Sequence, residues 1–382
     1  YAIAVAAAGA DRLPLARTEI RRALELRPDW DRAALLYSQL LARASTREAR
    51  DFLQDFVDRQ PKARDARMQL ARLLVGEKRY DEARRHFEAV LILAPESPDA
   101  VFSLGVLALQ QNDLAGAEAQ FKRILTIPVA DKNYAYFFLG QIAEEQGKRA
   151  DALGYYAQMT GGEHFVQSRI RSARLLVDQG RFEDARRQLS VDKIASADDR
   201  VQLAIAEAGL LRDAKQVQAA FDLLERLLEK QPEQPDLLYE SALLAEKLDQ
   251  IPLMESRLRK LIELRPESAQ AYNALGYSLA DRNLRLAEAR ELIEKALKLS
   301  PDDFFILDSM GWVLYRQGEL AAALGYLEQA YARREDPEVA AHIGEVLWAM
   351  GRQEDARRMW LGAQKKHPNN ESLTEVIQKF LR

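Results

Sequence analysis

Small and large apolar residues recur along this chain at an interval close to 34 residues. Alanine, or methionine once, stands at eleven positions that are 33 to 35 residues apart, and a large apolar residue follows four residues after each. One helical turn separates the members of each pair, so both lie on one face of a helix. The eleven positions are Ala16, Ala49, Ala83, Ala117, Ala152, Ala185, Ala220, Met254, Ala289, Ala323 and Ala356.

A second small residue lies about twelve residues before most of these positions, and it predicts a partner helix. Glycine inside a helix costs roughly 0.5–1 kcal/mol relative to alanine. Five glycines in one register therefore require a compensating interaction. We expect the neighbouring helix to pack closely against each glycine, which a larger side chain would prevent. The glycines are Gly105, Gly140, Gly276, Gly311 and Gly344, and Ala71, Ala173, Ala208 and Ala242 take the place elsewhere.

Turn residues divide the chain into helix-turn-helix units. Short polar breaks with Gly or Asn separate the two small positions, and a proline ends most units, as at Pro95 and Pro301. We expect one solenoid over residues 1–382: an incomplete first repeat at 1–28, repeats two to eleven at 29–368 and a C-terminal capping helix at 369–382. Two units lack the closing proline, near Gly161-Gly162 and Ser190 to Asp199, and these are candidates for altered curvature or local flexibility.

This pattern resembles the 34-residue tetratricopeptide repeat (TPR), which has a small residue in the first helix, Ala-x3-large in the second and Pro at the close. The resemblance extends over essentially the whole chain. It implies an all-α fold, a right-handed superhelical solenoid of about eleven helix-turn-helix repeats, with first helices lining a concave groove. Such a protein is expected to be a non-catalytic scaffold for protein–protein interaction.

Composition and charge limit the classes of partner and binding site that we expect for this chain. The formal net charge is −4, with 55 basic and 59 acidic side chains interspersed, so we expect no nucleic-acid partner. The absence of cysteine excludes disulfides and thiolate metal sites. No apolar run approaches the roughly 20 residues that span a bilayer.

Helical spacing predicts which side chains of the first helices face the groove. Aromatic residues and arginine, which dominate protein-binding hot spots, are frequent among them. An alternative is that the large aromatics fill gaps between adjacent units. The predicted groove residues are Arg72, Phe102, Phe137, Phe138, Gln141, Asn273, Tyr277, Asp308, Trp312, Tyr315, Arg316, His342, Glu345 and Trp348. Some TPR families bind a carboxyl terminus with a set of Lys and Asn side chains on three consecutive first helices. This sequence does not show that set, and only Asn273 and Arg316 occur at usable groove positions.

No pattern in the sequence indicates catalysis. The four histidines His86, His164, His342 and His367 lack metal-ligand spacing, and no nucleophile elbow or phosphate-binding loop occurs. Acidic pairs on an open solenoid are expected to be solvated or to cap helices. We expect no enzyme activity, no cofactor and no metal.

Three runs near the C-terminus carry a narrower resemblance. Residues 272–281, 301–316 and 336–348 are similar to proteobacterial TPR outer-membrane lipoproteins of the LbcA type. That resemblance implies a lipid-anchored adaptor on the periplasmic side of the outer membrane, whose partners are a C-terminal processing protease and its cell-wall hydrolase substrates. The alternatives are a cytoplasmic location, and the TPR portion of a larger envelope export or assembly machine or of an enzyme.

Overall fold

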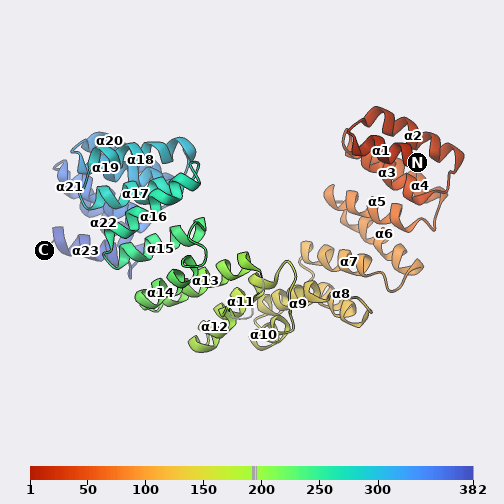
Figure 1. Ribbon diagram of the computed structural model, residues 1–382, viewed down its shortest axis with the longest axis horizontal. Coiled ribbons are helices and arrows are strands. Elements are labelled where there is room, and N and C mark those ends of the chain that lie inside the picture. Colours follow the sequence, from red (N-terminus) through yellow and green to blue (C-terminus); the bar gives the residue numbers. More distant parts are fainter. Residues whose placement is uncertain (192–193, 195, 382) are drawn as a thin grey trace. The chain divides into compact units, whose positions relative to one another are not determined.

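The computed structural model describes residues 1–191, 194 and 196–381. Every regular element within these ranges is an α-helix, so the all-α prediction is confirmed (Figure 1). The first twelve helices are α1 (Ala2–Gly9), α2 (Leu13–Leu26), α3 (Asp31–Ala42), α4 (Thr46–Arg59), α5 (Arg64–Gly76), α6 (Tyr80–Leu93), α7 (Pro98–Gln110), α8 (Leu114–Thr126), α9 (Asn133–Glu145), α10 (Arg149–Ala157), α11 (Phe165–Val177) and α12 (Phe182–Leu189).

The later helices continue the same alternation and end with one unpaired helix. They are α13 (Ala197–Asp213), α14 (Val217–Leu228), α15 (Pro235–Lys247), α16 (Ile251–Leu264), α17 (Ala269–Asp281), α18 (Leu286–Leu299), α19 (Phe304–Arg316), α20 (Leu320–Arg333), α21 (Pro337–Ala349), α22 (Gln353–Lys366) and α23 (Glu371–Phe380). Within the described ranges this makes eleven pairs and a C-terminal helix, as the repeat predicts.

The eleven alanine-type positions account for the pairing. Every one of them is fully buried, and the large residues four positions later are at most 3% exposed. Because both members of each pair are buried, the second helix of each unit presents this face to the core. The predicted repeat register is confirmed along the described chain.

The helical glycines leave room for large side chains of the partner helix. A Cβ atom on Gly105 would lie 2.8 Å from Phe121, and one on Gly276 would lie 2.6 Å from Ile293. Phe121 and Ile293 each stand four residues after the alanine of the same unit. Close helix approach therefore offsets the cost of glycine, as predicted.

Left-handed residues turn the chain between the two helices of a unit. Gly318 has φ 85° and Asn112 has φ 59°. The amide of Glu319 donates to the carbonyl of Leu314 at 2.9 Å, which closes the end of α19. The predicted Gly and Asn breaks are confirmed at these positions.

The chain divides into two compact units, residues 1–188 and 189–382. In the first unit α4 packs on α5, α6 on α7 and α8 on α9, so each pair stacks on the next. In the second unit α17 contacts α19, and α19 contacts α21, so first helices also touch one another. That residues 1–382 form a single right-handed superhelix stays a prediction.

The two repeats without a closing proline have the shortest second helices. Helix α10 has 9 residues and α12 has 8, whereas the other second helices have 12 to 14. Residues 192, 193 and 195 of the second departure lie outside the described residues. Altered curvature there stays a prediction. No helix of the described chain is long and apolar enough to cross a membrane.

Candidate protein-binding groove

The first helices of the second unit hold a connected cluster of polar and aromatic side chains. The Nδ1 atom of His342 on α21 lies 2.8 Å from Oδ1 of Asp308 on α19. The imidazole ring stacks on Trp312, with ring centroids 4.1 Å apart, and the Trp312 indole N–H donates to Asp281 at 3.2 Å. Three consecutive repeats are thereby joined along one face by side chains that stand 30 to 34 residues apart in the sequence.

The His342–Asp308 pair is buried, and each side chain is 13% exposed. Burial lowers the pKa of His342, but the charges of Asp308, Glu345 and Glu338 and the hydrogen bond to Asp308 outweigh it. The pKa of His342 therefore lies above its ordinary value. When His342 is protonated, its imidazolium forms an ion pair with the Asp308 carboxylate within the stack.

Trp312 packs within the cluster and leaves little surface for a partner, because only 5% of it is exposed. Tyr315 and Arg316 are half-buried at the end of the same helix. The Tyr315 ring lies 5.1 Å from Trp312, and the Arg316 guanidinium carbon lies 5.8 Å from the same indole. Arg316 thus makes a cation–π contact, and its guanidinium forms no hydrogen bond or ion pair among the described residues.

Tyr277 and Asn273 stand one helical turn apart on α17. Burial raises the pKa of Tyr277, and the charges of Asp281 and Asp308 raise it further. The Asn273 Oδ1 atom is buried and has no hydrogen-bond partner among the described residues. An unsatisfied buried acceptor is costly unless a donor reaches it.

Glu345 and Trp348 contact the C-terminal helix. Glu345 is 8% exposed and lies 3.3 Å from the Lys379 ammonium on α23. The Trp348 ring lies 5.4 Å from Phe380 and 5.9 Å from Trp360. These two predicted groove residues therefore attach α23 to α21 and α22 in the structure.

The first unit brings Arg72 and Phe102 together. Both line a hollow of about 180 Å³ between α5 and α7, whose other walls are mainly apolar. Arg72 is exposed, and Phe102 is half-buried. The Phe102 ring makes edge contacts with Tyr134 at 5.2 Å and Phe138 at 5.7 Å. An apolar side chain of a partner would fit this hollow.

The Phe137-Phe138 pair packs between units. Phe137 is 2% exposed, and its ring stacks on His164 with centroids 4.2 Å apart. Phe138 stacks on Phe121 at 4.9 Å. Gln141 is half-buried one turn further along α9. Of these three predicted groove residues, Phe137 has the least surface available to a partner.

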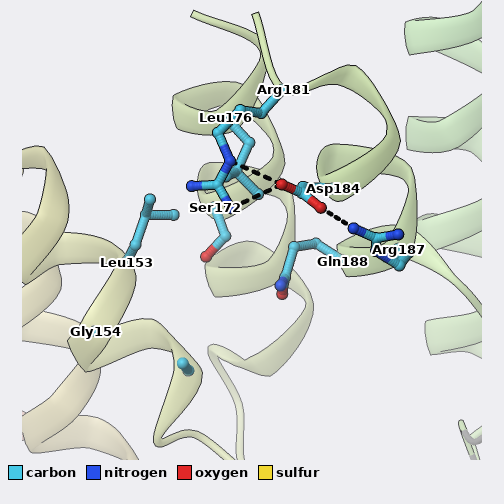
Figure 2. Close-up of a pocket in the computed structure, with 9 residues that line it drawn as sticks. Leu153, Gly154, Ser172, Leu176, Arg181, Asp184, Arg187 and Gln188 are labelled. Atoms are coloured by element: carbon cyan, nitrogen blue, oxygen red, sulfur yellow. Dashed lines mark hydrogen bonds and ion pairs between the residues drawn. The ribbon is translucent and has the colours of Figure 1, made fainter. Parts of the chain in front are cut away.

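A larger hollow of about 350 Å³ lies beside the short helix α10, away from the predicted residues. Figure 2 shows the Asp184 carboxylate between Arg181 and Arg187, with Leu153 and Gly154 on the opposite wall. Arg181 donates to Asp184 at 2.7 Å, and Arg187 pairs with the same carboxylate. The pKa of Asp184 is lowered by these guanidinium groups, Arg181 first.

Helical spacing missed Asp281, which accepts the Trp312 N–H. Asp281 stands five residues after Gly276, and the predicted groove residue Arg316 stands five residues after Gly311. The same spacing could therefore have identified Asp281. His164 was also missed, because it precedes α11 and helical spacing does not place a loop residue. No group of three or more His, Asp or Glu side chains in residues 1–191, 194 and 196–381 could hold a metal ion.

Repeated helix pairs with half-buried aromatic and charged side chains along their first helices define a helical-repeat scaffold for protein interaction. A tetratricopeptide-repeat model matches residues 68–132, 170–235 and 254–304, and a second model of that description matches residues 306–336. These segments make up more than half of the sequence. The chain belongs to the tetratricopeptide-repeat family, whose fold is generally non-catalytic and whose members generally bind protein partners.

Two bacterial relatives are longer than this chain. It is 46% identical over 211 residues to TPR repeat-containing protein PA4667 of Pseudomonas aeruginosa, a match covering 55% of this chain and 36% of that protein. It is 30% identical over 213 residues to Cellulose synthase operon protein C of Xanthomonas axonopodis pv. citri, covering 55% and 12%. The chain thus spans about a third of the first relative and about an eighth of the second.

A solved tetratricopeptide repeat protein from Parabacteroides merdae is 18% identical, with a TM-score of 0.46. The match covers 75% of this chain and 99% of that one. The Cut9–Hcn1 assembly of the APC/C is 13% identical, with a TM-score of 0.44 over 99% of this chain and 89% of that one.

Proposed function

We propose that this chain is the partner-binding scaffold of a periplasmic lipoprotein adaptor. It holds a C-terminal processing protease, its cell-wall hydrolase substrates, or both, and it performs no catalysis itself. Its place is the periplasmic side of the outer membrane, reached through a lipid anchor upstream of Tyr1.

One observation carries the proposal. Three runs resemble proteobacterial TPR outer-membrane lipoproteins: residues 272–281, 301–316 and 336–348. They contain most of α17, α19 and α21. The same three helices contain the cluster of Asp308, Trp312 and His342. The resemblance therefore concentrates on first helices, which present side chains to partners in such scaffolds, and not on the second helices between them.

The test uses purified chain, a purified periplasmic C-terminal processing protease and a purified cell-wall hydrolase. Immobilised chain is expected to capture the protease, and added chain is expected to accelerate cleavage of the hydrolase. Replacing Tyr315→Ala together with Arg316→Ala should reduce capture. Both residues stand at the C-terminal end of α19, and part of each side chain remains accessible to a partner.

The matched control is Tyr326→Ala with Arg333→Ala, which removes the same residue types from α20, the second helix of the same repeat. Capture is expected to survive the control. Equal loss in both variants would refute the role of the first helices. Failure of the unaltered chain to capture either the protease or the hydrolase would refute the adaptor function. Circular dichroism melting confirms that the variants are folded.

A second candidate is the TPR portion of a larger envelope export or assembly machine, or of an enzyme with its catalytic domain elsewhere. The 30% identity to a protein named for a cellulose synthase operon favours this candidate. The full reading frame separates the two proposals. A lipobox upstream supports the lipoprotein adaptor, whereas a further domain supports the larger machine.

A further inference from the structure

The hollow beside α10 has a buried hydroxyl group without a hydrogen-bond partner. Ser172 on α11 is 3% exposed and lines this hollow, and its oxygen remains accessible from it. Figure 2 shows that oxygen directed toward the space between the Leu153 and Gln188 side chains. Neither the Ser172 hydroxyl nor the Gln188 side-chain amide forms a hydrogen bond among the described residues. A ligand that bonds these groups would remove the cost of leaving them unsatisfied.

The other serines that are buried in the described chain all have partners. Ser241 donates to Glu225 at 2.8 Å, and Ser278 accepts from Arg282 at 2.8 Å. Three more donate to carbonyl oxygens of their own helices, namely Ser38, Ser168 and Ser309. The free hydroxyl of Ser172 is therefore specific to this hollow and is not a general property of serine in these helices.

Small and apolar side chains keep the hollow open. A Cβ atom on Gly154 would have no other atom within 4 Å, and Ala157 is the last residue of the short helix α10. Leu153 and Leu176 add apolar walls. The volume of about 350 Å³ lies within the range of about 300–1,000 Å³ that ligand-binding pockets occupy. The hollow can therefore take in side chains of a partner.

Cations exceed acids among the residues that line the hollow. Arg181 and Arg187 line it together with a single acid, Asp184. Both guanidinium groups pair with that carboxylate, and Arg187 does so only through Nη2. One positive charge is left, and Arg187 keeps Nε and Nη1 donors that no described residue accepts. A carboxylate of a partner would neutralise this charge and accept from these donors.

A hollow of about 500 Å³ between α20 and α22 stands at the corresponding place five repeats later. The same order of charges lines it, in Arg352, Asp355 and Arg358. Glu328, Glu335 and Lys366 line it as well, so three cations accompany three acids. The earlier repeat has Ala157 and His164 in place of the two glutamates. The chain therefore supplies its own balancing acids in the later hollow and omits them in the earlier one.

We propose that the hollow between α10 and α12 binds a polypeptide segment of a partner through an aspartate or glutamate side chain. The carboxylate pairs with Arg187 and Arg181 and supplies the charge that glutamates of the chain itself supply in the later hollow. This site lies between second helices. It is therefore separate from the first-helix groove and goes beyond the adaptor function proposed above.

The walls of the hollow favour a polypeptide over a small free anion. Main-chain groups of an extended segment can bond the Ser172 hydroxyl and the Gln188 amide, each of which can donate and accept. Aliphatic carbons of the segment contact Leu153 and Leu176, whereas an inorganic anion would leave these apolar walls in contact with water.

The experiment measures fluorescence anisotropy of a labelled peptide of alternating glutamate and alanine against the full chain. A peptide with glutamine in place of glutamate is the comparison. The glutamate peptide is expected to bind at least about tenfold more tightly, because it supplies the carboxylates. The net charge of −4 repels an acidic peptide, so general attraction would not produce this preference. Equal binding of the two peptides would disprove the proposal.

Arg187→Gln tests the charge of the hollow and should weaken binding of the glutamate peptide about fivefold. Arg358→Gln is the matched control, because Arg358 has the corresponding position in the later hollow and a similar exposure, 80% against 74%. Both variants change the net charge equally, so binding in the control should fall less than about twofold. Equal weakening in both would reveal a general charge effect and overturn the proposal.

Ser172→Ala tests the hydroxyl and should weaken binding about fivefold, since one hydrogen bond is lost. The melting temperature should not fall, because the hydroxyl has no partner in the free chain. Ser168→Ala is the matched control on the same helix, since Ser168 is also buried but donates to Phe165 at 2.7 Å and does not line the hollow. Binding should survive the control, and equal binding in both variants would count against the site.

Three further outcomes would each overturn the proposal. Displacement of the peptide by an equal concentration of free glutarate would assign the hollow to a small organic acid. Loss of peptide binding in the Tyr315→Ala, Arg316→Ala variant would place the peptide in the first-helix groove. Self-association that Arg187→Gln abolishes, without peptide binding, would assign the hollow to a second copy of the chain. None of these measurements uses the protease, so the adaptor function stands or fails separately.

Discussion

Gly311 of α19 lies directly against Leu327 of α20. A Cβ atom at Gly311 would come within 2.5 Å of Leu327 Cγ and 3.1 Å of the Ala323 carbonyl oxygen. Real Cβ atoms do not approach other atoms this closely, so a side chain at Gly311 would force the two helices of the repeat apart. The glycine and leucine positions of one repeat are therefore a matched pair.

Gly311→Leu is expected to destabilise the chain by about 1–3 kcal/mol or more, because it overpacks this contact. Chemical denaturation monitored by circular dichroism measures the shift. Gly325→Ala on α20 is the matched control, since no atom lies within 4 Å of a Cβ there, and its helix should gain about 0.5–1 kcal/mol. Loss of stability in both variants, or in neither, would contradict the packing account.

The helix pairs could be predicted from the sequence because their cause is local. An alanine and a large residue four positions apart define a buried stripe, and a proline or glycine ends the helix. This pattern repeats in every unit, so an exception such as Met254 does not obscure it. Burial of Met254 at 0% exposure follows the same rule.

The groove could be predicted only in part, because helical spacing does not show what the next repeat contributes. Trp312 and Phe137 have groove spacing, yet His342 and His164 of following repeats stack on them. The stacking rings cover surface that the spacing assigns to the groove. Contacts between residues about 30 apart depend on how adjacent repeats pack. The spacing of residues within a single helix does not predict them.

The His342–Asp308 pair is expected to make stability depend on pH. The folded pKa of His342 lies above its ordinary value of 6.5, so the pair stabilises the fold fully below 6.5. That contribution is lost as pH rises through the folded pKa. Titration of the His342 ring resonances by NMR measures it, and Asp308→Asn should move the midpoint downward.

His86 provides an internal control for that titration. Burial first, and then the charge of Arg67, lowers its pKa, so it should titrate below 6.5 in the unaltered chain. Asp308→Asn lies far along the sequence and should leave His86 unchanged. A His342 midpoint at or below that of His86 in the unaltered chain would contradict the ion pair.

Glu255 is expected to stabilise the second unit at neutral pH. Hydrogen bonds from Arg285 and Arg259 lower its pKa to about 2. Its contribution is present above the ordinary value of 4.5 and is lost as pH falls toward 2. Glu255→Gln should therefore lower the denaturation midpoint at pH 7, modestly because both arginines are more than 40% exposed.

The salt dependence of stability distinguishes the Arg259–Glu255–Arg285 network from a single surface ion pair. At about 1 M salt, where the screening length is about 3 Å, the difference between Glu255→Gln and the unaltered chain should shrink. Glu263→Gln is the control, because Glu263 is 71% exposed and, among the described residues, forms an ion pair only with Lys260, at 3.8 Å. A midpoint equally low in both variants would show that the Arg259–Glu255–Arg285 network adds nothing.

Leu373 is expected to hold the C-terminal helix in place. Its side chain is fully buried, and its amide donates to the Asn370 side chain at 2.9 Å, which caps α23. Leu373→Ala should cost about 2–5 kcal/mol, whereas Leu361→Ala, at a side chain 44% exposed, should change stability by less than about 0.5 kcal/mol. Because repeat stability is nearly a sum of neighbouring terms, the loss should be local. Hydrogen exchange should accelerate in α21 to α23 and remain slow in α15 and α17, and uniform acceleration would show that α23 supports the whole unit.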